Sequence, residues 1–378
     1  MNISFFQKCS NCGACYNICP KGAISINDEG TFYLPVVNEN LCIDCSLCTN
    51  ICPVNQKYKI NEPRYACAGW HKNSRIVLNS SSGGVFYGIA HNIISNGGVV
   101  FAAIYSNDYQ TVNIASTDET SLEKMLKSKY VESIVDLSYQ RIKSELEKGR
   151  LVLFCGTPCQ VAGLSNYLGI VYDSLLTCDF VCGGLPSHKM YQEYISYLQT
   201  RYNSKIKKVD FRPKSHGWKR YAFKVDFENG KEYLRIGTED PYLKSFLYGK
   251  YTVRDYCLEC KFAESHASDI TIADFWLYEK ISSLRNENGI SLVLCNTQKG
   301  INAINSLKEE YYISDINIEK ASYNKQIKAS EEKIRKHNLF INYYEHYGLF
   351  SAYKKFLPDS FNSKLKNLLI RKFLRKRR

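Results

Sequence analysis

Two copies of one cysteine pattern, between residues 9 and 53, constrain this chain more than any other feature. The copies, CSNCGACYNICP and CIDCSLCTNICP, both read C-x2-C-x2-C-x3-C-P. Each cysteine of the first run has a counterpart 33 positions later, which indicates an internal duplication. Thiolates are the soft ligands that iron-sulfur clusters need, and three closely spaced cysteines can hold three corners of a cubane.

The fourth ligand of each cluster is expected from the other run, as this spacing is typical of paired clusters. One predicted 4Fe-4S site is Cys9, Cys12, Cys15 and Cys52, and the other is Cys42, Cys45, Cys48 and Cys19. Gly13, small where the loop wraps the cluster, and Pro20 and Pro53, which end the ligand runs, fit this geometry. The alternatives are disulfides or zinc knuckles, but the crossed spacing favours clusters. Roughly the first sixty residues resemble bacterial dicluster ferredoxins.

The rest of the chain has the composition of a globular protein. It has 378 residues, 44% hydrophobic and 13% aromatic, which allows two or three domains with a sizeable core. Cluster ligands begin at residue 9, so we see no signal peptide, and no apolar run reaches the length of about 18 residues that a membrane span needs. Sixteen cysteines in such a chain favour metal sites in a reducing cytoplasm.

Positive charge is concentrated at the C-terminus. From Lys354 onward, ten Lys and Arg residues accompany a single Asp, so this segment carries +9 of the net charge of +13. The rest of the chain carries a net charge of only about +4, which argues against a broad nucleic-acid-binding surface. The segment has apolar residues at helical spacing: Leu365, Leu368, Leu369 and Phe373. It is therefore either a basic amphipathic helix on an anionic membrane surface or a C-terminal helix docked on the core.

A serine and glycine segment follows the first predicted domain boundary, which we place at polar residues near Asn61 and Pro63. Residues 80–84, SSSGG, precede a helical pattern over residues 85–94 and a strand over residues 99–105. Hydroxyls and glycine amides at a helix start suit an anion such as a phosphate. The same residues are also ordinary capping and turn residues.

Two buried strands bring cysteines toward their C-terminal ends. The run at 151–154 is followed by Gly156, Thr157, Pro158, Cys159 and a helix led by Gln160, and the run at 175–181 is followed by Cys182. Proteins with parallel sheets place cofactors at this edge. A single cysteine there is also compatible with a small buried apolar residue.

A β-rich insertion and a last cysteine pair complete the pattern. Strands are predicted at 207–211, 221–227 and 233–236, with a hairpin turn at Asn229-Gly230. The loop 212–220 contains Arg212, Lys214, His216 and Trp218, which suit an anionic substrate, although a solvated loop is the alternative.

Cys257 and Cys260 form a C-x2-C pair ahead of a strand at 270–272 that ends near Asp274 and Trp276. A lone C-x2-C serves zinc, iron-sulfur or redox exchange. Because eight cluster ligands precede it, we interpret it as half of a third iron-sulfur site, completed by two of the strand-end cysteines.

Four segments together resemble the beta subunit family of coenzyme F420 hydrogenases and dehydrogenases: SSSGGVF, GTPCQVAGL, CDFVCGGLPS, and the stretch from CLEC to DITIADFW. With the dicluster ferredoxin that members often carry, the resemblance covers roughly residues 1–320. It implies a flavoprotein core that binds FAD beside a 4Fe-4S cluster. Matched residue by residue, it implies a third cluster on Cys159, Cys182, Cys257 and Cys260, and it leaves Cys67, Cys155, Cys178 and Cys295 to packing.

The same resemblance implies flavin contacts in two loops: Ser81, Ser82, Gly83, Gly84, Gly156, Thr157, Pro158 and Gln160. The chain departs from the family pattern in two places. Gly183 stands where a histidine is usual, so any role of that histidine cannot be transferred. Ala273 and Leu277 replace the glycines that often flank the D-F-W motif.

The expected architecture has three parts: an α+β ferredoxin-like dicluster module over residues 1–61, an α/β flavoprotein core with a β-hairpin insertion over residues 62–330, and a basic helical tail over residues 331–378. The expected function is an iron-sulfur flavoprotein oxidoreductase. Electrons would pass between the clusters and a flavin that exchanges hydride with an organic substrate. No catalytic triad or paired-carboxylate pattern is visible, so the cofactors would carry the chemistry.

Expected partners are a redox partner protein or ferredoxin and a small-molecule hydride donor or acceptor. In the family the latter is the deazaflavin coenzyme, and here it is that coenzyme or a cell-envelope polysaccharide precursor. The expected location is the cytoplasm, with peripheral contact at the inner membrane face through the tail as an option; nucleic acid is not expected. Two alternatives remain: a non-catalytic electron-transfer subunit, and a redox-sensing binding protein.

Overall fold

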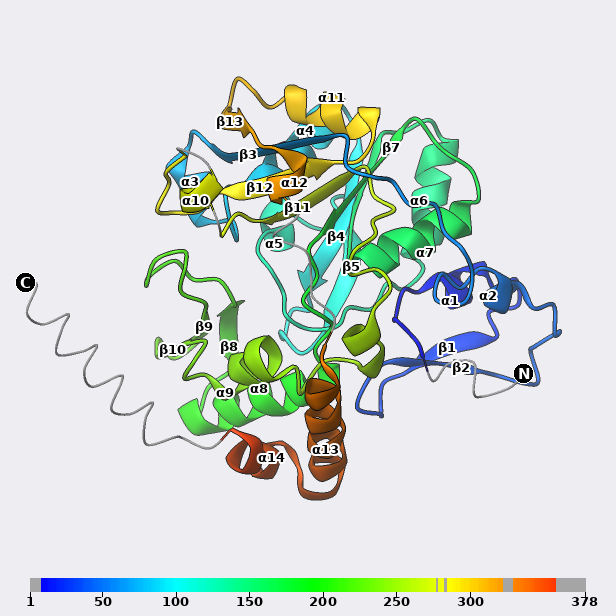
Figure 1. Ribbon diagram of the computed structural model, residues 1–378. Coiled ribbons are helices and arrows are strands. Elements are labelled where there is room, and N and C mark those ends of the chain that lie inside the picture. The colour runs from blue at the N-terminus through cyan, green and yellow to red at the C-terminus, as the bar shows by residue number, and fades with distance from the viewer. Residues whose placement is uncertain (1–7, 277, 282–283, 322–328, 358–378) are drawn as a thin grey trace, which may run out of the picture.

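The computed structural model describes residues 8–276, 278–281, 284–321 and 329–357. Its main body is an eight-stranded mixed sheet with helices on both faces (Figure 1). The strand order is β13-β3-β12-β11-β7-β6-β4-β5. Four neighbouring strands run parallel: β11 (Ile270–Asp274), β7 (Leu175–Phe180), β6 (Val152–Cys155) and β4 (Val99–Tyr105). Antiparallel pairings add β12 (Ser291–Cys295), β3 (Tyr65–His71), β13 (Tyr311–Asp315) and β5 (Val112–Ser116).

The central strands are apolar on both sides because each side lies under helices. Successive strand residues point to opposite faces. Phe101 and Phe154 pack with α6 (Ser138–Glu147) and α7 (Pro158–Leu168) on one face. Val100 and Leu153 pack with α4 (Val85–Ser95) and α11 (Gln298–Asn305) on the other. The shorter helices are α3 (Ser74–Leu78), α5 (Leu122–Met125), α10 (Tyr278–Ile281) and α12 (Ile318–Ala321).

The N-terminal module packs directly on this sheet domain (Figure 1). It contains the helices α1 (Ala14–Ile18) and α2 (Leu47–Asn50) and the antiparallel strands β1 (Ile24–Asn27) and β2 (Leu34–Val37). Cys12, Ala14 and Tyr16 share one hydrophobic cluster with Tyr139 of α6 and Val161 of α7. The module and the face of the sheet that it covers therefore form one continuous core.

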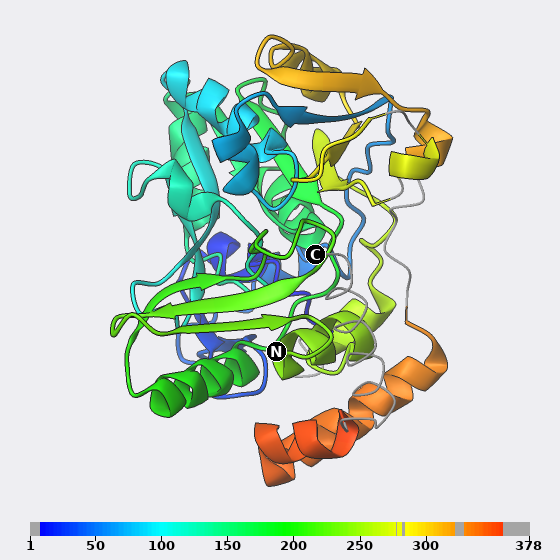
Figure 2. The ribbon, with the colours of Figure 1, turned by 90° about the vertical axis from the view of Figure 1, so that its left-hand side faces the viewer.

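A second, three-stranded antiparallel sheet lies below the main one (Figure 2). Its strands are β8 (Ile206–Asp210), β9 (Ala222–Phe227) and β10 (Glu232–Ile236), with Gly230 at a positive φ of 81° in the hairpin turn. Its core is closed by α8 (His188–Tyr202), α9 (Pro241–Lys244), α13 (Glu331–Tyr347) and α14 (Leu349–Phe356). The π-helical turn η2 (Ser245–Gly249) and the 3-10 turn η3 (Asp255–Glu259) follow α9 in the chain.

The mixed α/β architecture and the N-terminal ferredoxin-type domain are confirmed. The main sheet differs in detail, because antiparallel strands extend its parallel centre at both edges. The helical remainder is present as α13 and α14, which end at Phe356. The end of the basic tail, residues 358–378, which includes the predicted amphipathic helix around Leu365 to Phe373, lies outside the described residues. Among the described helices, none is long and apolar enough to span a membrane.

Candidate iron-sulfur and cofactor sites

The outer cluster site of the dicluster module surrounds a small cavity. The four predicted ligands, Cys19, Cys42, Cys45 and Cys48, all line it. Cys45 is exposed, whereas Cys48 is buried. Four thiols around one cavity are the donor set that a 4Fe-4S cluster requires. We call this the outer site.

The inner site consists of Cys9, Cys12, Cys15 and Cys52, of which Cys12 is buried against the sheet domain and the other three are partly buried. Burial raises the pKa of the Cys12 thiol, and the neighbouring Cys52 raises it further. The same two causes, together with Cys9, raise the pKa of Cys15. Burial and neighbouring thiols make these cysteines hard to ionise in the absence of metal. The positive charge of bound iron would stabilise the four thiolates at this site.

The duplication seen in the sequence also appears in the backbone of the ligand loops. Asn11 and Asp44, which are 33 residues apart, both have a left-handed φ, at 57° and 51°. Gly13 and Ser46, at the next equivalent positions, have φ values of 83° and 58°. The left-handed residues turn each loop tightly, so that its cysteines point to a common centre.

A third group of four cysteines meets at the boundary between the module and the sheet domain. Cys159 is the second residue of α7, Cys182 follows β7, Cys257 lies in η3 and Cys260 ends it. All four line one cavity, together with Ser10 and Pro158. Burial raises the pKa of Cys182 to about 11. This is the set that the family resemblance implied.

The three sites are neighbours, with the inner site between the other two. Cys48 of the outer site contributes to the electrostatic environment of Cys15 of the inner site. Ser10, next to the inner ligand Cys9, lines the third cavity, and its carbonyl oxygen lies 3.6 Å from Cys159 Sγ. Outer, inner and third sites are thus neighbours in that order.

The donor geometry fits clusters better than disulfides or single ions. All sixteen cysteines lie in the described part of the chain, and none of them forms a disulfide bond. Among the described residues, no three His, Cys, Asp or Glu side chains converge closely enough for one metal ion. A tetrahedral zinc ion holds its sulfurs about 2.3 Å from one point. Cysteines that surround a cavity are better suited to a group larger than a single ion, such as a 4Fe-4S cluster.

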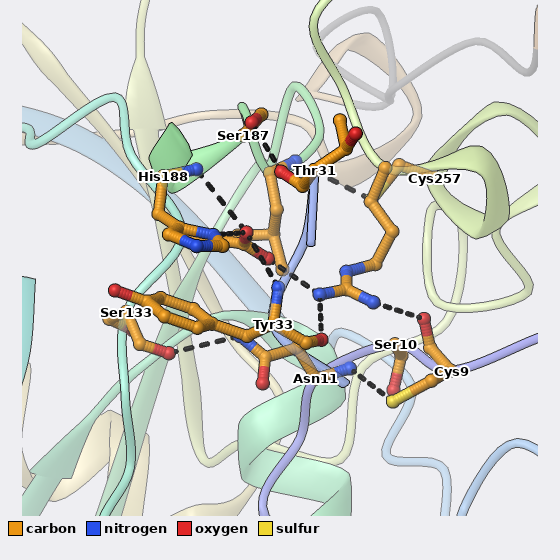
Figure 3. A network of polar contacts seen from close by, with 12 residues as sticks. Cys9, Ser10, Asn11, Thr31, Tyr33, Ser133, Ser187, His188 and Cys257 are labelled. Carbon is orange, nitrogen blue, oxygen red and sulfur yellow. Dashed lines mark hydrogen bonds and ion pairs between the residues drawn. The ribbon is translucent and has the colours of Figure 1, made fainter. Parts of the chain in front are cut away.

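A buried polar network joins the module to the third site (Figure 3). Glu132 accepts a hydrogen bond from the backbone of Tyr33, at 3.1 Å, and forms an ion pair with Arg254, at 2.6 Å. His188 Nδ1 lies 2.7 Å from the same carboxylate, and its ring stacks on Tyr33 at 3.6 Å. Burial raises the pKa of Glu132, but Arg254 and His188 outweigh it and hold that pKa below its usual range. The sequence offered no local signal for this network.

The SSSGG loop meets the predicted substrate loop at the end of β11. Arg212 is buried and donates to both oxygens of Asp274, at 2.7 and 3.3 Å, and to the Ser81 carbonyl oxygen, at 3.1 Å. Its guanidinium lies 4.3 Å from the centre of the Tyr221 ring. Lys214 Nζ donates to the Ser82 carbonyl oxygen, at 2.9 Å. His216 is exposed and does not join this group.

Several predicted flavin contacts already have structural partners. The Ser82 hydroxyl donates to the Ile290 carbonyl oxygen, at 2.6 Å, and the Gly83 amide donates to Ser291 Oγ, at 2.9 Å. Gly84 begins α4 at a φ of 88° without a side-chain cap. A Cβ on Gly83 would lie 2.2 Å from the Gly69 carbonyl oxygen, so this glycine is required by its contact with β3.

The GTPCQ loop is likewise held in place by the protein itself. Thr157 caps α7 by accepting from the Gln160 amide, and Gln160 Oε1 accepts from the Thr157 amide at 3.0 Å. Gln160 Nε2 also donates to Ser133 Oγ, at 2.9 Å. Pro158 favours the first helical turn and lines the third cavity. Gly156 follows Cys155 at the end of β6.

Two lysines that sequence reasoning missed lie near this edge. Lys127 Nζ lies 2.5 Å from Asp210 Oδ2. Lys129 Nζ donates to the Leu126 carbonyl oxygen, at 2.9 Å. Burial lowers the pKa of Lys129 to about 7, and burial, with Arg212 and Lys127 nearby, lowers that of Lys214 to about 7 as well. The segment has no regular periodicity, which explains why no pattern pointed to it.

Of the four remaining cysteines, Cys155 and Cys178 lie opposite each other on β6 and β7. Cys67 and Cys295 belong to β3 and β12. Cys67, Cys178 and Cys295 are buried in the core under α4 and α11, and Cys155 packs against that core. All four therefore have the apolar surroundings of packing residues.

Comparisons with known proteins match two regions of the chain to family models. Residues 149–321 match the family model for the C-terminal part of the coenzyme F420 hydrogenase/dehydrogenase beta subunit, and residues 8–56 match the 4Fe-4S dicluster domain. Among solved structures, a chain of the xenon-derivatised F420-reducing NiFe hydrogenase complex from Methanosarcina barkeri aligns at 15% identity and a TM-score of 0.48. That alignment covers 77% of this chain and 95% of the other. No curated protein matches the chain. The chain therefore carries a 4Fe-4S dicluster domain at residues 8–56, followed by a region, residues 149–321, that matches the C-terminal part of the coenzyme F420 hydrogenase/dehydrogenase beta subunit.

Proposed function

We propose that the chain is an iron-sulfur flavoprotein oxidoreductase in which three 4Fe-4S clusters connect a redox partner to a flavin and an organic substrate. The observation that carries this proposal is the third cysteine site. Four thiols from α7, the loop after β7 and η3 surround one cavity beside the inner site. An electron path from a ferredoxin-type module into the sheet domain requires redox groups at this boundary.

The residues of the chain have distinct tasks in this proposal. Cys45 is exposed at the outer site, where electrons would enter or leave, while Cys12 of the inner site is buried. Ser10 and Pro158 line the third cavity beside its four cysteines. The clusters supply one-electron transfer, and the flavin supplies the step between one-electron and two-electron chemistry.

The flavin position is proposed at the carboxyl ends of β6 and β11. This is the sheet edge at which proteins with parallel strands bind cofactors. Gly156, Thr157 and Pro158 lie between the end of β6 and the third cavity, so a flavin held there would be next to the third cluster. Ser81 and Gly84, on the loop before α4, are the other proposed contacts. Ser82, Gly83 and Gln160 would act by shaping the loops, since their polar groups are already bonded.

An anionic organic substrate fits this edge. Four basic side chains from two segments lie around it: Lys127, Lys129, Arg212 and Lys214. Among the described carboxylates, Asp210 and Asp274 are the ones that form ion pairs with them. Both the deazaflavin coenzyme and a charged cell-envelope polysaccharide precursor belong to this substrate class. His216, which is exposed in the same loop as Lys214, is a further proposed substrate contact.

The deciding experiment is anaerobic purification followed by iron, sulfide and flavin analysis. We expect about twelve irons and one flavin per chain, in line with three cubanes. About eight irons without flavin would contradict the oxidoreductase and leave a dicluster module beside a domain of another kind.

A second candidate is an electron-transfer subunit without flavin, serving a partner enzyme that holds the substrate site. The hydrogen bonds that already occupy Ser82 and Gly83 favour it, because they reduce the number of free donors at the SSSGG loop. About twelve irons, no flavin, and reduction of an acceptor only after a second protein is added would identify this function.

A further inference from the structure

A buried ion pair, Arg254 with Glu132, lies where the dicluster module meets the third cysteine site. Arg254 is 3% exposed and Glu132 is fully buried, and Arg254 Nη2 lies 2.6 Å from Glu132 Oε2. Water does not screen charges in such a place, so their effect on nearby groups is larger than at the surface.

Arg254 lies against ligands of both the inner and the third site. Its Nη1 donates to the Cys9 carbonyl oxygen, at 3.4 Å. Its own carbonyl oxygen accepts from the Cys257 amide, at 2.9 Å, because Arg254 immediately precedes η3. Its Nε is buried and has no acceptor among the residues that the structure describes. The Nε–H can therefore donate to an acceptor that the described residues do not supply, such as a sulfur.

Glu132 fixes this guanidinium from the side of the sheet domain. The Glu132 amide donates to the Pro186 carbonyl oxygen, at 2.9 Å, in the loop that follows Cys182. Its carboxylate accepts from the amides of Tyr33, at 3.1 Å, and His188, at 3.3 Å (Figure 3). Rotation of the carboxylate would break contacts with both parts of the molecule, so the charge of Arg254 is held at one position.

We propose that Arg254 is a positioning residue that sets the reduction potentials of the inner and third clusters together, with Glu132 partly balancing its charge. Reduction adds one negative charge to a cluster, and a fixed positive charge nearby stabilises that state. The guanidinium contacts the inner ligand Cys9, and the backbone of the same residue is hydrogen-bonded to the third-site ligand Cys257. One positive charge beside both sites raises both potentials, which keeps the two clusters matched for electron transfer. This inference rests on the cluster assignment of the proposed function.

The test is an anaerobic redox titration of the purified full-length protein, followed by electron paramagnetic resonance at one fixed pH. Arg254→Gln should lower the midpoint potentials of the inner and third clusters. Glu132→Gln should raise them, because the positive charge is then unbalanced. Arg254→Lys keeps the charge and should restore most of the lost potential. A purely structural role would not produce shifts of opposite sign.

Two controls separate this effect from a general change in charge. Arg150→Gln removes the same charge from a surface pair with Asp118 and Glu145 and should leave all potentials unchanged. The outer cluster, with exposed Cys45, should also keep its potential in every variant.

Unchanged potentials in Arg254→Gln with full iron content would overturn the proposal. If that variant fails to bind iron, Glu132→Gln decides: an upward shift supports the proposal, and no shift or a downward shift overturns it. A wild-type protein with only two clusters would refute the third site alone, because the inner cluster would still report the effect of Arg254.

Discussion

Cys159 owes its proposed role to residues far away in the chain. It is the second residue of α7, and its thiol faces the cavity that Cys182, Cys257 and Cys260 complete. Cys155, four residues earlier, packs against the apolar core under α4. The two cysteines are close in sequence, yet only one of them lies at a donor site.

Replacing Cys159 by serine should remove one cluster and spare the other two. Serine is a poor ligand for iron, so the third site would lose a corner while the eight ligands of the module remain. We expect iron content to fall by about four per chain, with the paired-cluster signals unchanged. Cys155→Ser serves as the matched control and should keep all the iron. Full iron content in Cys159→Ser would remove this residue from the ligand set.

Lys129 should make stability depend on pH above neutrality. Burial lowers its pKa from 10.5 to about 7 in the folded protein. Between these values the unfolded chain holds the proton that the folded protein has released, so stability rises with pH, at most by about 1.4 kcal/mol per pH unit. Denaturant unfolding at several pH values above 7 should show this rise in the wild type. Lys129→Met should reduce the slope and leave the part that Lys214 contributes, and an equal slope in both proteins would contradict the assignment.

At the scale of elements, the loop before α4 is held by close backbone packing. A Cβ on Gly83 would approach the Gly69 carbonyl oxygen to 2.2 Å and the Ser291 amide nitrogen to 2.8 Å. Gly83→Ala should therefore cost about 3 kcal/mol of unfolding free energy. Gly30→Ala, which meets only the Phe32 carbonyl oxygen at 3.5 Å, is the control and should change little. A Gly83→Ala protein of normal stability that binds no flavin would instead show a ligand role.

The ligand loop of the outer site presents apolar side chains to solvent. Leu41, Ile43 and Leu47 are 42 to 56% exposed around the cysteines that would bind the outer cluster. Exposed apolar residues beside a redox centre suit a transient protein partner. Ile43→Asp should slow reduction by a ferredoxin at least severalfold while leaving reduction by a small dye unchanged. Leu339→Asp, an equally exposed site on α13, should affect neither; slowing by both reductants alike would argue against docking here.

The elements that sequence reasoning predicted well have strong local signals. β6 is an apolar run, and α7 begins with Thr157, Pro158 and Gln160, whose capping contacts are all local. Residues 126–135 had no such signal, because they form no regular helix or strand. Their role depends on contacts with residues that are distant in the sequence. Glu132 belongs to this segment, and its partners lie 56 and 122 residues away. Motif matching brought the four cysteines of the third cavity together, since the cysteine chemistry is visible in the sequence; the ion pair beside it is not.

At the scale of the whole molecule, the dicluster module is joined to the sheet domain by specific contacts. Tyr139 of α6 donates from its hydroxyl toward the Cys12 carbonyl oxygen, at 2.5 Å, and the Gln160 carbonyl oxygen, at 2.7 Å. Asn11 Nδ2 donates to the Ser133 carbonyl oxygen, at 3.1 Å. The inner and third sites therefore keep a fixed separation.

Tyr139→Phe should loosen this junction without unfolding the protein. Loss of a buried hydroxyl that contacts two carbonyl oxygens should cost about 1 to 3 kcal/mol. Hydrogen exchange should become faster in α1 and around Cys12, while the three-stranded sheet keeps its protection. Tyr248→Phe, at an exposed tyrosine, is the control. Equal exchange rates at α1 and Cys12 in Tyr139→Phe and Tyr248→Phe would show that Tyr139 does not join the dicluster module to the sheet domain.

The equivalent loop positions 13 and 46 suggest how such a module can diversify. A Cβ at Gly13 would lie 2.7 Å from Val135 Cβ, so the inner copy accepts only glycine there. The outer copy has Ser46 at the same turn, in an exposed loop. The sequence of the outer copy can therefore change, by evolution or by engineering, to suit new electron donors. The sequence of the inner copy is constrained by its contact with the sheet domain.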